Sequence, residues 1–212
     1  CGMPKFEHGD LAAVADKAKR TARALKPQIE AGWDVVALVP SCALMMKFEW
    51  PLIVPDDPDV QALAQATYDI TEYVVDIANN EGLAEGLQPL DGGVAIHLAC
   101  HARAQNMGPK GAEMLRRIPQ TKVEVIQRCS GHGGLWGVKK DSFPVALKVG
   151  KGAFRDIEKT KKSTQLCSEC PLAGLHLVQG LEWMNEGQTP RFTESRHPIQ
   201  VMAAAYGLSD GR

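Results

Sequence analysis

One stretch of the sequence is the main evidence for the expected fold: Gly93-Val94-Ala95-Ile96-His97-Leu98-Ala99-Cys100. A continuous, mainly apolar run of this length fits a strand that is buried on both faces of a parallel sheet. Cys100 follows at the carboxyl end of this strand. In α/β folds, functional groups gather beyond the carboxyl ends of parallel strands. The stretch therefore predicts a parallel α/β sheet that carries a cysteine at its functional edge.

The same pattern recurs along the chain. Apolar runs at 34–39 and 122–127 precede Cys42 and Cys129, and a brief strand at 164–166 precedes Cys167. Helical spacing of apolar residues separates these runs, with helices expected at 10–30, 59–80, 109–117, 141–159, 171–183 and 198–206. Short buried strands that alternate with helices predict a doubly wound α/β fold with cysteines at the strand ends.

A repeated order of motifs within the sequence predicts two related lobes. Cys1-Gly2 is followed by a long helix, an apolar strand and Cys42, and Ser130-Gly131 is followed by a helix, a strand and Cys167. Repeated order of this kind is the mark of a duplicated unit. We expect residues 1–90 to form the C-terminal part of a first lobe, truncated upstream because the chain opens abruptly on Cys1. Residues 91–212 then form a second, complete lobe.

Composition narrows the classes of function. Lys and Arg number 24 against 25 Asp and Glu, so the net charge of −1 gives no general attraction to nucleic acid. No stretch approaches the roughly 20 apolar residues that span a bilayer, and the N-terminus has no signal-peptide pattern. The sequence predicts a cytoplasmic protein, free or peripheral on the cytoplasmic face of the inner membrane.

The cysteines are the strongest chemical signal. Six cysteines in a chain without an export signal favour metal ligation over disulfides, because a reducing cytoplasm keeps thiols free. The pair Cys167-x-x-Cys170 offers two thiolates from one turn, and Cys100 and Cys129 stand at equivalent strand ends. Four thiolates suit a [4Fe–4S] cluster or a tetrahedral zinc ion. A thiol–disulfide catalyst at Cys167 and Cys170 ranks lower, because two other cysteines compete for the pair.

Other residues beside these cysteines are candidates for the site. Gly131 and Gly133 free backbone N–H groups to approach sulfur closely. His101 and His132 adjoin proposed ligands and are expected to tune a cluster by hydrogen bonding, with capping or surface roles as the alternative. Cys42 and Cys1 are candidate ligands in the first lobe, and for Cys42 a plain core position is an equal alternative.

The cysteine spacing resembles the cysteine-rich CCG domain found in heterodisulfide reductase and its relatives. Three segments resemble, more particularly, the C-terminal part of the iron–sulfur subunit of anaerobic glycerol-3-phosphate dehydrogenase: VPSCALMMKFEWP at 39–51, HLACHARAQ at 97–105 and RCSGHGG at 128–134. Ser130 stands where the family has a second cysteine, and Met45 where the first lobe would have its last. These departures favour a four-thiolate cluster in the second lobe over the family's five-cysteine, non-cubane type.

The resemblance implies an electron-transfer subunit of an oxidoreductase complex. Such a subunit relays electrons from a flavin-bearing dehydrogenase subunit, similar to glycerol-3-phosphate dehydrogenase, toward the membrane quinone pool. The protein itself fixes the position, solvent access and potential of the cluster and supplies no acid–base catalysis. The alternative from a different class is a zinc-stabilised interaction module without redox activity.

Overall fold

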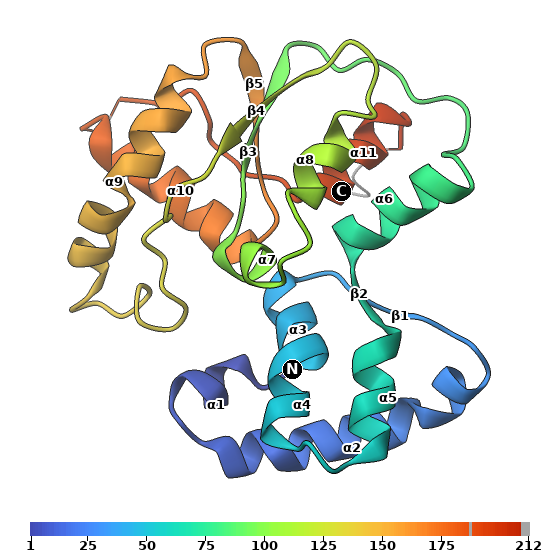
Figure 1. Ribbon diagram of the computed structural model, residues 1–212. Coiled ribbons are helices and arrows are strands. Elements are labelled where there is room, and N and C mark those ends of the chain that lie inside the picture. The colour runs from blue at the N-terminus through green and yellow to red at the C-terminus, as the bar shows by residue number, and fades with distance from the viewer. Residues whose placement is uncertain (187, 209–212) are drawn as a thin grey trace.

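The computed structural model describes residues 1–186 and 188–208, and it contains two separate parallel sheets (Figure 1). The smaller sheet pairs β1 (Val35–Ala37) with β2 (Thr67–Asp69). The larger sheet has three parallel strands in the order β4-β3-β5, with bounds Gly93–His97 for β3, Lys122–Ile126 for β4 and Ser163–Ser168 for β5. The predicted α/β class with short parallel strands and flanking helices is confirmed.

Helices account for most of the remaining regular structure. A π-helical segment, η1 (Met45–Glu49), joins α3 and α4. The α-helices are α1 (Met3–Glu7), α2 (Leu11–Glu30), α3 (Pro40–Leu44), α4 (Trp50–Ile53), α5 (Pro58–Ala66), α6 (Ile70–Asn80), α7 (Cys100–Ala104), α8 (Lys110–Leu115), α9 (Phe143–Lys159), α10 (Pro171–Met184) and α11 (Pro198–Ala205). None of the helices in the described part of the chain combines the length and hydropathy needed to span a membrane.

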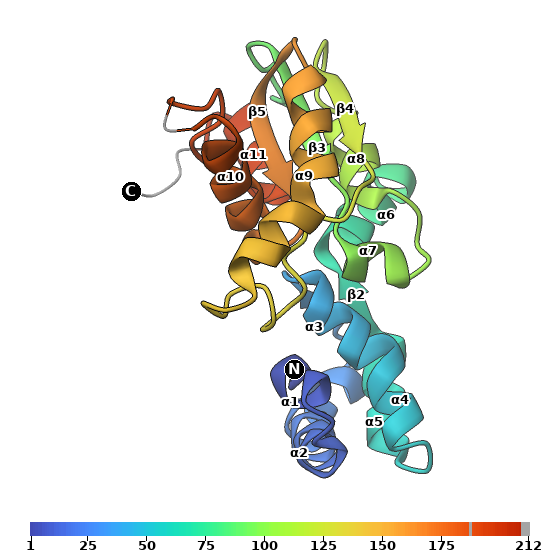
Figure 2. The same cartoon turned by 90° about the vertical axis from the view of Figure 1, so that its left-hand side faces the viewer.

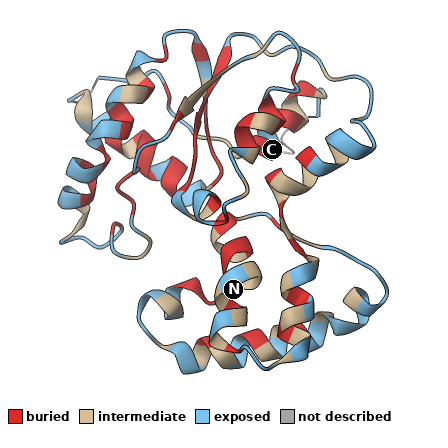
Figure 3. Cartoon of the chain, viewed as in Figure 1, coloured by how far each residue is buried: buried red, intermediate tan, exposed pale blue. Residues whose placement is uncertain are grey.

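The larger sheet is covered on both faces, which explains its continuous apolar strands. Val94, Ile96 and Leu98 point to one side and pack with α6, α8 and α11. Ala95 and Leu166 point to the other side and pack with α9 and α10. Figure 1 shows α9 and α10 on one side of the sheet and α6, α8 and α11 on the other, and Figure 2 looks onto the sheet from the α9 side. In Figure 3 the whole of β3 is coloured as buried.

The smaller sheet belongs to a second core, at the bottom of Figure 1, built by α1, α2, α4 and α5. The indole Nε1–H of Trp50 donates to the carbonyl of Cys1 at 3.1 Å inside this core. The two cores meet where α3 lies beside α7. There the buried side chain of Gln105 donates from Nε2 to Asp69 Oδ2 at 3.1 Å, which ties the end of β2 to α7.

The structure divides one of the expected helices. The single helix expected at 59–80 is divided into α5 and α6 by strand β2. Thr67 and Tyr68 favour extended backbone, and Asp69 starts α6 with a capping box completed by Glu72. Val75 of α6, which lies within the expected first lobe 1–90, packs in the core of the larger sheet. The division at residue 90 stays a prediction.

The two edge strands of the larger sheet differ in what lies beside them. Beside β5 runs an irregular segment: the Arg196 N–H donates to the Leu166 carbonyl, and the Ser168 N–H donates to the Arg196 carbonyl, both at 3.0 Å. On the open edge strand β4, Lys122 and Glu124 form an ion pair at 2.9 Å. One edge is therefore paired by backbone and the other carries opposite charges.

Candidate metal centre

Cys100 and Cys129 come together at the carboxyl edge of the larger sheet. β3 and β4 pair in register, and each strand is followed within three residues by one of these cysteines. The pKa of the Cys100 thiol is raised by burial and, secondarily, by the neighbouring Cys129 thiol. The N–H of Gly131 points at Cys129 Sγ from 3.4 Å. Two of the predicted ligands are therefore neighbours.

Cys170 completes a three-cysteine wall around a cavity of about 180 Å³. It lies at the N-cap of α10, directly before Pro171. The wall is formed by Cys100, Cys129, Cys170, His97, His101, His132, Gly133, Gly134, Ser130, Ala99, Ala173 and Glu7. An adjoining cavity of about 210 Å³ shares Cys170, His101 and His132 and adds Cys1 from the other core. Both cavities therefore lie where the two cores face each other.

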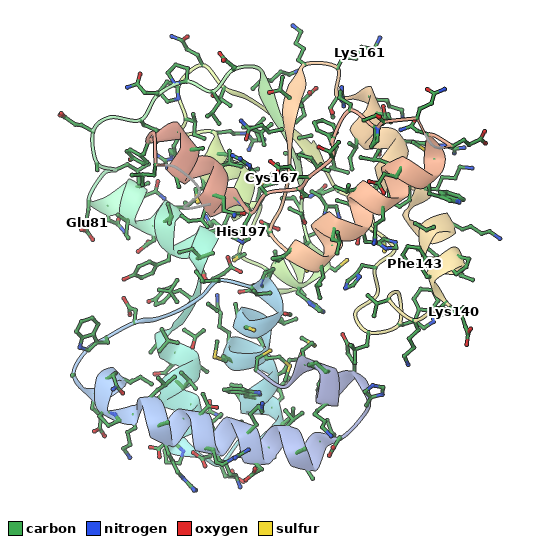
Figure 4. The ribbon with its side chains drawn as sticks, turned by 180° about the vertical axis from the view of Figure 1, so that it is seen from behind. Glu81, Lys140, Phe143, Lys161, Cys167 and His197 are labelled. Carbon is green, nitrogen blue, oxygen red and sulfur yellow. The ribbon has the colours of Figure 1, made fainter. Side chains whose placement is uncertain are left out.

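Cys167 does not join this wall. It lies inside β5 and not beyond it, because the strand runs on to Ser168. Its side chain is fully buried in the apolar cluster on the α6, α8 and α11 side of the sheet, opposite Ile96 in the strand register. Figure 4 shows Cys167 in the interior of the molecule. Burial raises the pKa of this thiol well above its ordinary value, and the nearby Glu169 adds to the effect.

Cys42, the remaining candidate, lies in α3 at the amino-terminal side of the π-helical segment. It is half-buried, and it lines neither of the two cavities. Met45, in the position of the missing family cysteine, is fully buried in the core around Trp50. The structure thus separates Cys42 from the three cysteines of the 180 Å³ cavity and brings Cys1 next to them.

Of the predicted glycines and histidines, Gly133, His101 and His132 line the same cavity, and Gly131 lies between the lining residues Ser130 and His132. Gly131 has φ +84°, and a Cβ atom there would meet the Ala146 carbonyl at 2.2 Å, so only glycine fits. His132 is buried, and within the described residues its Nδ1 has no hydrogen-bond partner. Burial and then His176 lower the pKa of His132, which keeps its imidazole neutral. His101 lines both cavities beside Cys100.

His97, which is not among the site residues predicted from the sequence, joins two of the cysteine-bearing segments. Its Nε2 lies 3.0 Å from the carbonyl of Arg128, and its Nδ1 lies 3.2 Å from the hydroxyl of Ser168. A carbonyl only accepts, so Nε2 carries the hydrogen and Nδ1 accepts from Ser168. The Ser168 hydroxyl also accepts from the Cys170 N–H at 3.4 Å. A lone polar residue in the apolar run at 93–99 was the available signal.

Glu169 is a second residue of this region that the sequence pattern did not predict. Its carboxylate is almost fully buried and accepts from the Ala99 N–H at 3.0 Å, directly before Cys100. Burial raises its pKa to about 7, against the opposing effect of this backbone hydrogen bond. Its position within Cys167-Ser168-Glu169-Cys170 was the only signal. The side chain links the pair on β5 and α10 to the start of α7.

The chemistry of the donor set fits a soft metal. Three thiols line one cavity, and thiolates are the ligands of iron–sulfur clusters and zinc. The Gly131 N–H points at the sulfur of Cys129, one of these three thiols. Within the described residues no group of three or more His, Cys, Asp or Glu side chains is placed to hold one metal ion directly.

The structure is thus a cysteine-rich α/β domain, in which helices cover both faces of a parallel sheet and cysteines lie at its carboxyl edge. Residues 94–177 match the family model of the CCG cysteine-rich domain, which confirms the resemblance for this region.

The chain is also similar to several curated proteins. The chain is 25% identical over 97% of its length to the C subunit of anaerobic glycerol-3-phosphate dehydrogenase from Escherichia coli, and spans 49% of that protein. It is 28% identical over 80% of its length to lactate utilization protein A of Geobacillus kaustophilus, covering 70% of it. It is 26% identical over 86% of its length to the B subunit of fumarate reductase (CoM/CoB) from Methanothermobacter marburgensis, covering 34% of it.

Proposed function

We propose that this chain is an iron–sulfur electron-transfer module of an oxidoreductase complex. The observation that carries the proposal is the grouping of Cys100, Cys129 and Cys170 around one cavity at the carboxyl edge of the sheet. The CCG match and the relatives named as subunits of a dehydrogenase and a reductase support it. A cluster bound there accepts and releases single electrons.

We infer that the cluster is a [4Fe–4S] cluster bound by Cys100, Cys129 and Cys170. Cys167 is the proposed fourth ligand on the strength of the sequence pattern alone, because its thiol faces the apolar core. His97 holds the segments of Cys129 and Cys170 at fixed spacing. The Gly131 N–H points at the Cys129 sulfur, and such donors raise the reduction potential of a cluster.

The wider role follows from the similarity to a subunit of anaerobic glycerol-3-phosphate dehydrogenase. We propose that a flavin-bearing dehydrogenase subunit donates electrons to the cluster and that they pass on toward membrane quinone. We also propose that the module works in the cytoplasm or at its membrane face. Residues 1–90 would be part of a first lobe, in which Cys1 and Cys42 are the candidate ligands.

Metal and sulfide analysis of anaerobically purified protein tests this function. We expect about four iron and four acid-labile sulfide per chain, with broad visible absorption, as four thiolates suggest. About one zinc per chain without sulfide would instead establish the zinc-stabilised interaction module. Thiolates bind both metals, so the composition decides between them.

Single substitutions then test the ligands. Cys100→Ala, Cys129→Ala and Cys170→Ala should each abolish the absorption, because each removes a thiol from the cavity wall. Cys167→Val keeps an apolar side chain of similar size in the core, so it separates packing from ligation. Loss of iron with an unchanged unfolding midpoint of the metal-free protein would make Cys167 a ligand. Retained iron would leave it a core residue and require another fourth donor.

A further inference from the structure

A basic and apolar surface borders the candidate metal centre. It consists of the loop 133–142 and the outward side of α9, and we call it the basic face. Its exposed cations are Lys139, Lys140, Lys148, Lys151 and Arg155, and its exposed apolar side chains are Trp136, Val138, Val145 and Val149. Trp136 is 44% and Val138 59% exposed, and apolar side chains that gather on one exposed surface mark an interaction site.

The basic face has a positive net charge, whereas the whole molecule has a slightly negative one. Between 133 and 155 there are five basic residues and one acidic residue, Asp141, whereas the whole chain carries −1. No ion pair is found for Lys139, Lys140, Lys148 or Arg155 in the part of the chain that the structure describes. Lys151 lies over the Trp183 ring at 5.8 Å. These cations are therefore available to an anionic surface.

The same loop forms part of the wall of the metal centre. Gly133 and Gly134 line the cavity with Cys100 and Cys129, and Leu135 and Val138 line the adjoining one with Cys170. The loop is held in place: the Leu135 N–H donates to Glu7 at 3.1 Å, and the Phe143 N–H donates to the Lys139 carbonyl at 2.8 Å. A molecule docked on the basic face would be separated from the thiols by little more than this loop.

We infer that the basic face is the docking surface for the acidic face of a redox partner protein, an inference that rests on the proposed function. Complementary charge steers association and fixes orientation, and exposed aromatic and aliphatic side chains supply the desolvated contact. Electron transfer also requires a partner that approaches the centre closely. A bilayer is the other anionic candidate, but exposed lysines and valines alternate here without the separate apolar stripe of a helix that lies in a membrane.

The test uses a defined acidic probe, an FMN-loaded flavodoxin, with the anaerobic protein. Electron transfer from the flavodoxin hydroquinone is followed by stopped flow from 20 to 300 mM salt, and affinity for oxidised flavodoxin is measured by titration. We expect the wild-type rate to fall with salt. The triple variant K139E/K140E/K148E should transfer electrons at least tenfold more slowly at 20 mM salt and lose the salt dependence. Trp136→Ala should weaken binding severalfold without changing the salt slope.

The matched control is K159E/K161E/K162E, which makes the same change in net charge at and just beyond the far end of α9. Figure 4 shows Lys161 and Lys140 well apart on the molecule. This control should keep the wild-type rate, and an equal loss in both triple variants would overturn the inference. Unchanged flavodoxin affinity in the K139E/K140E/K148E variant would also overturn the inference. The inference would fail as well if this variant lost binding to vesicles containing 30% phosphatidylglycerol but kept its affinity for flavodoxin. Absence of a cluster would leave the affinity measurement intact and contradict only the proposed function.

Discussion

At the scale of single residues, His97 shows how one buried polar side chain can hold two segments of the chain in place. It is almost fully buried within β3, and burial lowers its pKa, so the neutral ring with hydrogen on Nε2 is the form present. The ring accepts from Ser168 and donates to the Arg128 carbonyl. Each neighbour is adjacent to a segment that carries a cysteine of the cavity. One imidazole thus sets the spacing of two proposed ligands.

Replacing His97 by Phe tests this positioning role. The substitution keeps the ring volume and leaves the Ser168 hydroxyl and the Arg128 carbonyl without their partner. We expect a loss of about 2 to 4 kcal/mol in the free energy of unfolding, since the buried Ser168 hydroxyl costs about 1 to 3 kcal/mol when unsatisfied and the partly buried Arg128 carbonyl adds about 1 kcal/mol. Iron content should fall as well. His8→Phe, at an exposed turn, is the control and should change stability by less than about 0.5 kcal/mol.

Single residues also mark where prediction from sequence reached its limit. The spacing of Cys100 and Cys129 after apolar runs was enough to predict that they lie near one edge of a sheet. The orientation of Cys167 was not predictable, because one residue more or less in a strand turns a side chain to the other face. β5 extends to Ser168, which places Cys167 toward α6, α8 and α11.

At the scale of elements, the contact between α9 and the segment after β4 shapes the metal centre. A Cβ atom at Gly150 of α9 would meet the Ser130 carbonyl at 2.3 Å and the Phe154 ring at 2.4 Å. The glycine therefore lets the helix approach the backbone beside Cys129. Two residues on, Gly152 is exposed, and the nearest atom to its Cβ would be Arg128 Cδ at 3.9 Å.

These two glycines give opposite predictions for the same substitution. Gly150→Ala should lower the free energy of unfolding by about 2 kcal/mol or more, because overpacking against backbone outweighs the gain in helix propensity. It should also reduce iron content by moving Ser130. Gly152→Ala should raise stability by about 0.5 to 1 kcal/mol through propensity alone. Urea unfolding of both variants, with metal analysis, checks the difference. Equal effects would mean that the close contact at Ser130 does not constrain the fold.

Elements were predicted well where their apolar period was long. The helices expected at 10–30 and 141–159 are found at Leu11–Glu30 and Phe143–Lys159. The strand β2 was not predictable, because three residues give too short a pattern and the flanking helical periods appeared continuous. Its pairing with β1, about 30 residues away, is a tertiary interaction that local sequence does not encode.

At the scale of the whole molecule, buried histidines couple stability to pH. Burial lowers the pKa of His97, His132, His176 and His197 from an ordinary value of 6.5. Below about pH 6.5 the unfolded chain binds more protons than the folded one, so stability rises with pH through this window and is lost as pH falls. Glu169 acts in the opposite direction, because its raised pKa of about 7 lets the folded state hold the extra proton above pH 4.5.

We therefore expect the metal-free protein to lose stability as the pH falls from 7.5 to 5.5, four histidines outweighing one carboxyl. Each histidine contributes at most about 1.4 kcal/mol per pH unit. Urea midpoints measured across this range check the slope. His176→Phe keeps the contacts with Phe143 and Phe154 and removes one titrating ring, so its slope should be shallower. A midpoint that rises toward pH 5.5 would contradict the assignment.

The structures of the two edge strands of the larger sheet explain how the protein avoids edge-to-edge association between copies. An open parallel strand is a template on which another chain can extend the sheet. Beside β5 the template is already used, because Arg196 lies between solvent and the hydrogen-bonding groups of Leu166 and Ser168. On β4 the ion pair of Lys122 and Glu124 discourages a second strand from settling. The sheet can thus stay three strands wide while its carboxyl edge is left open for chemistry.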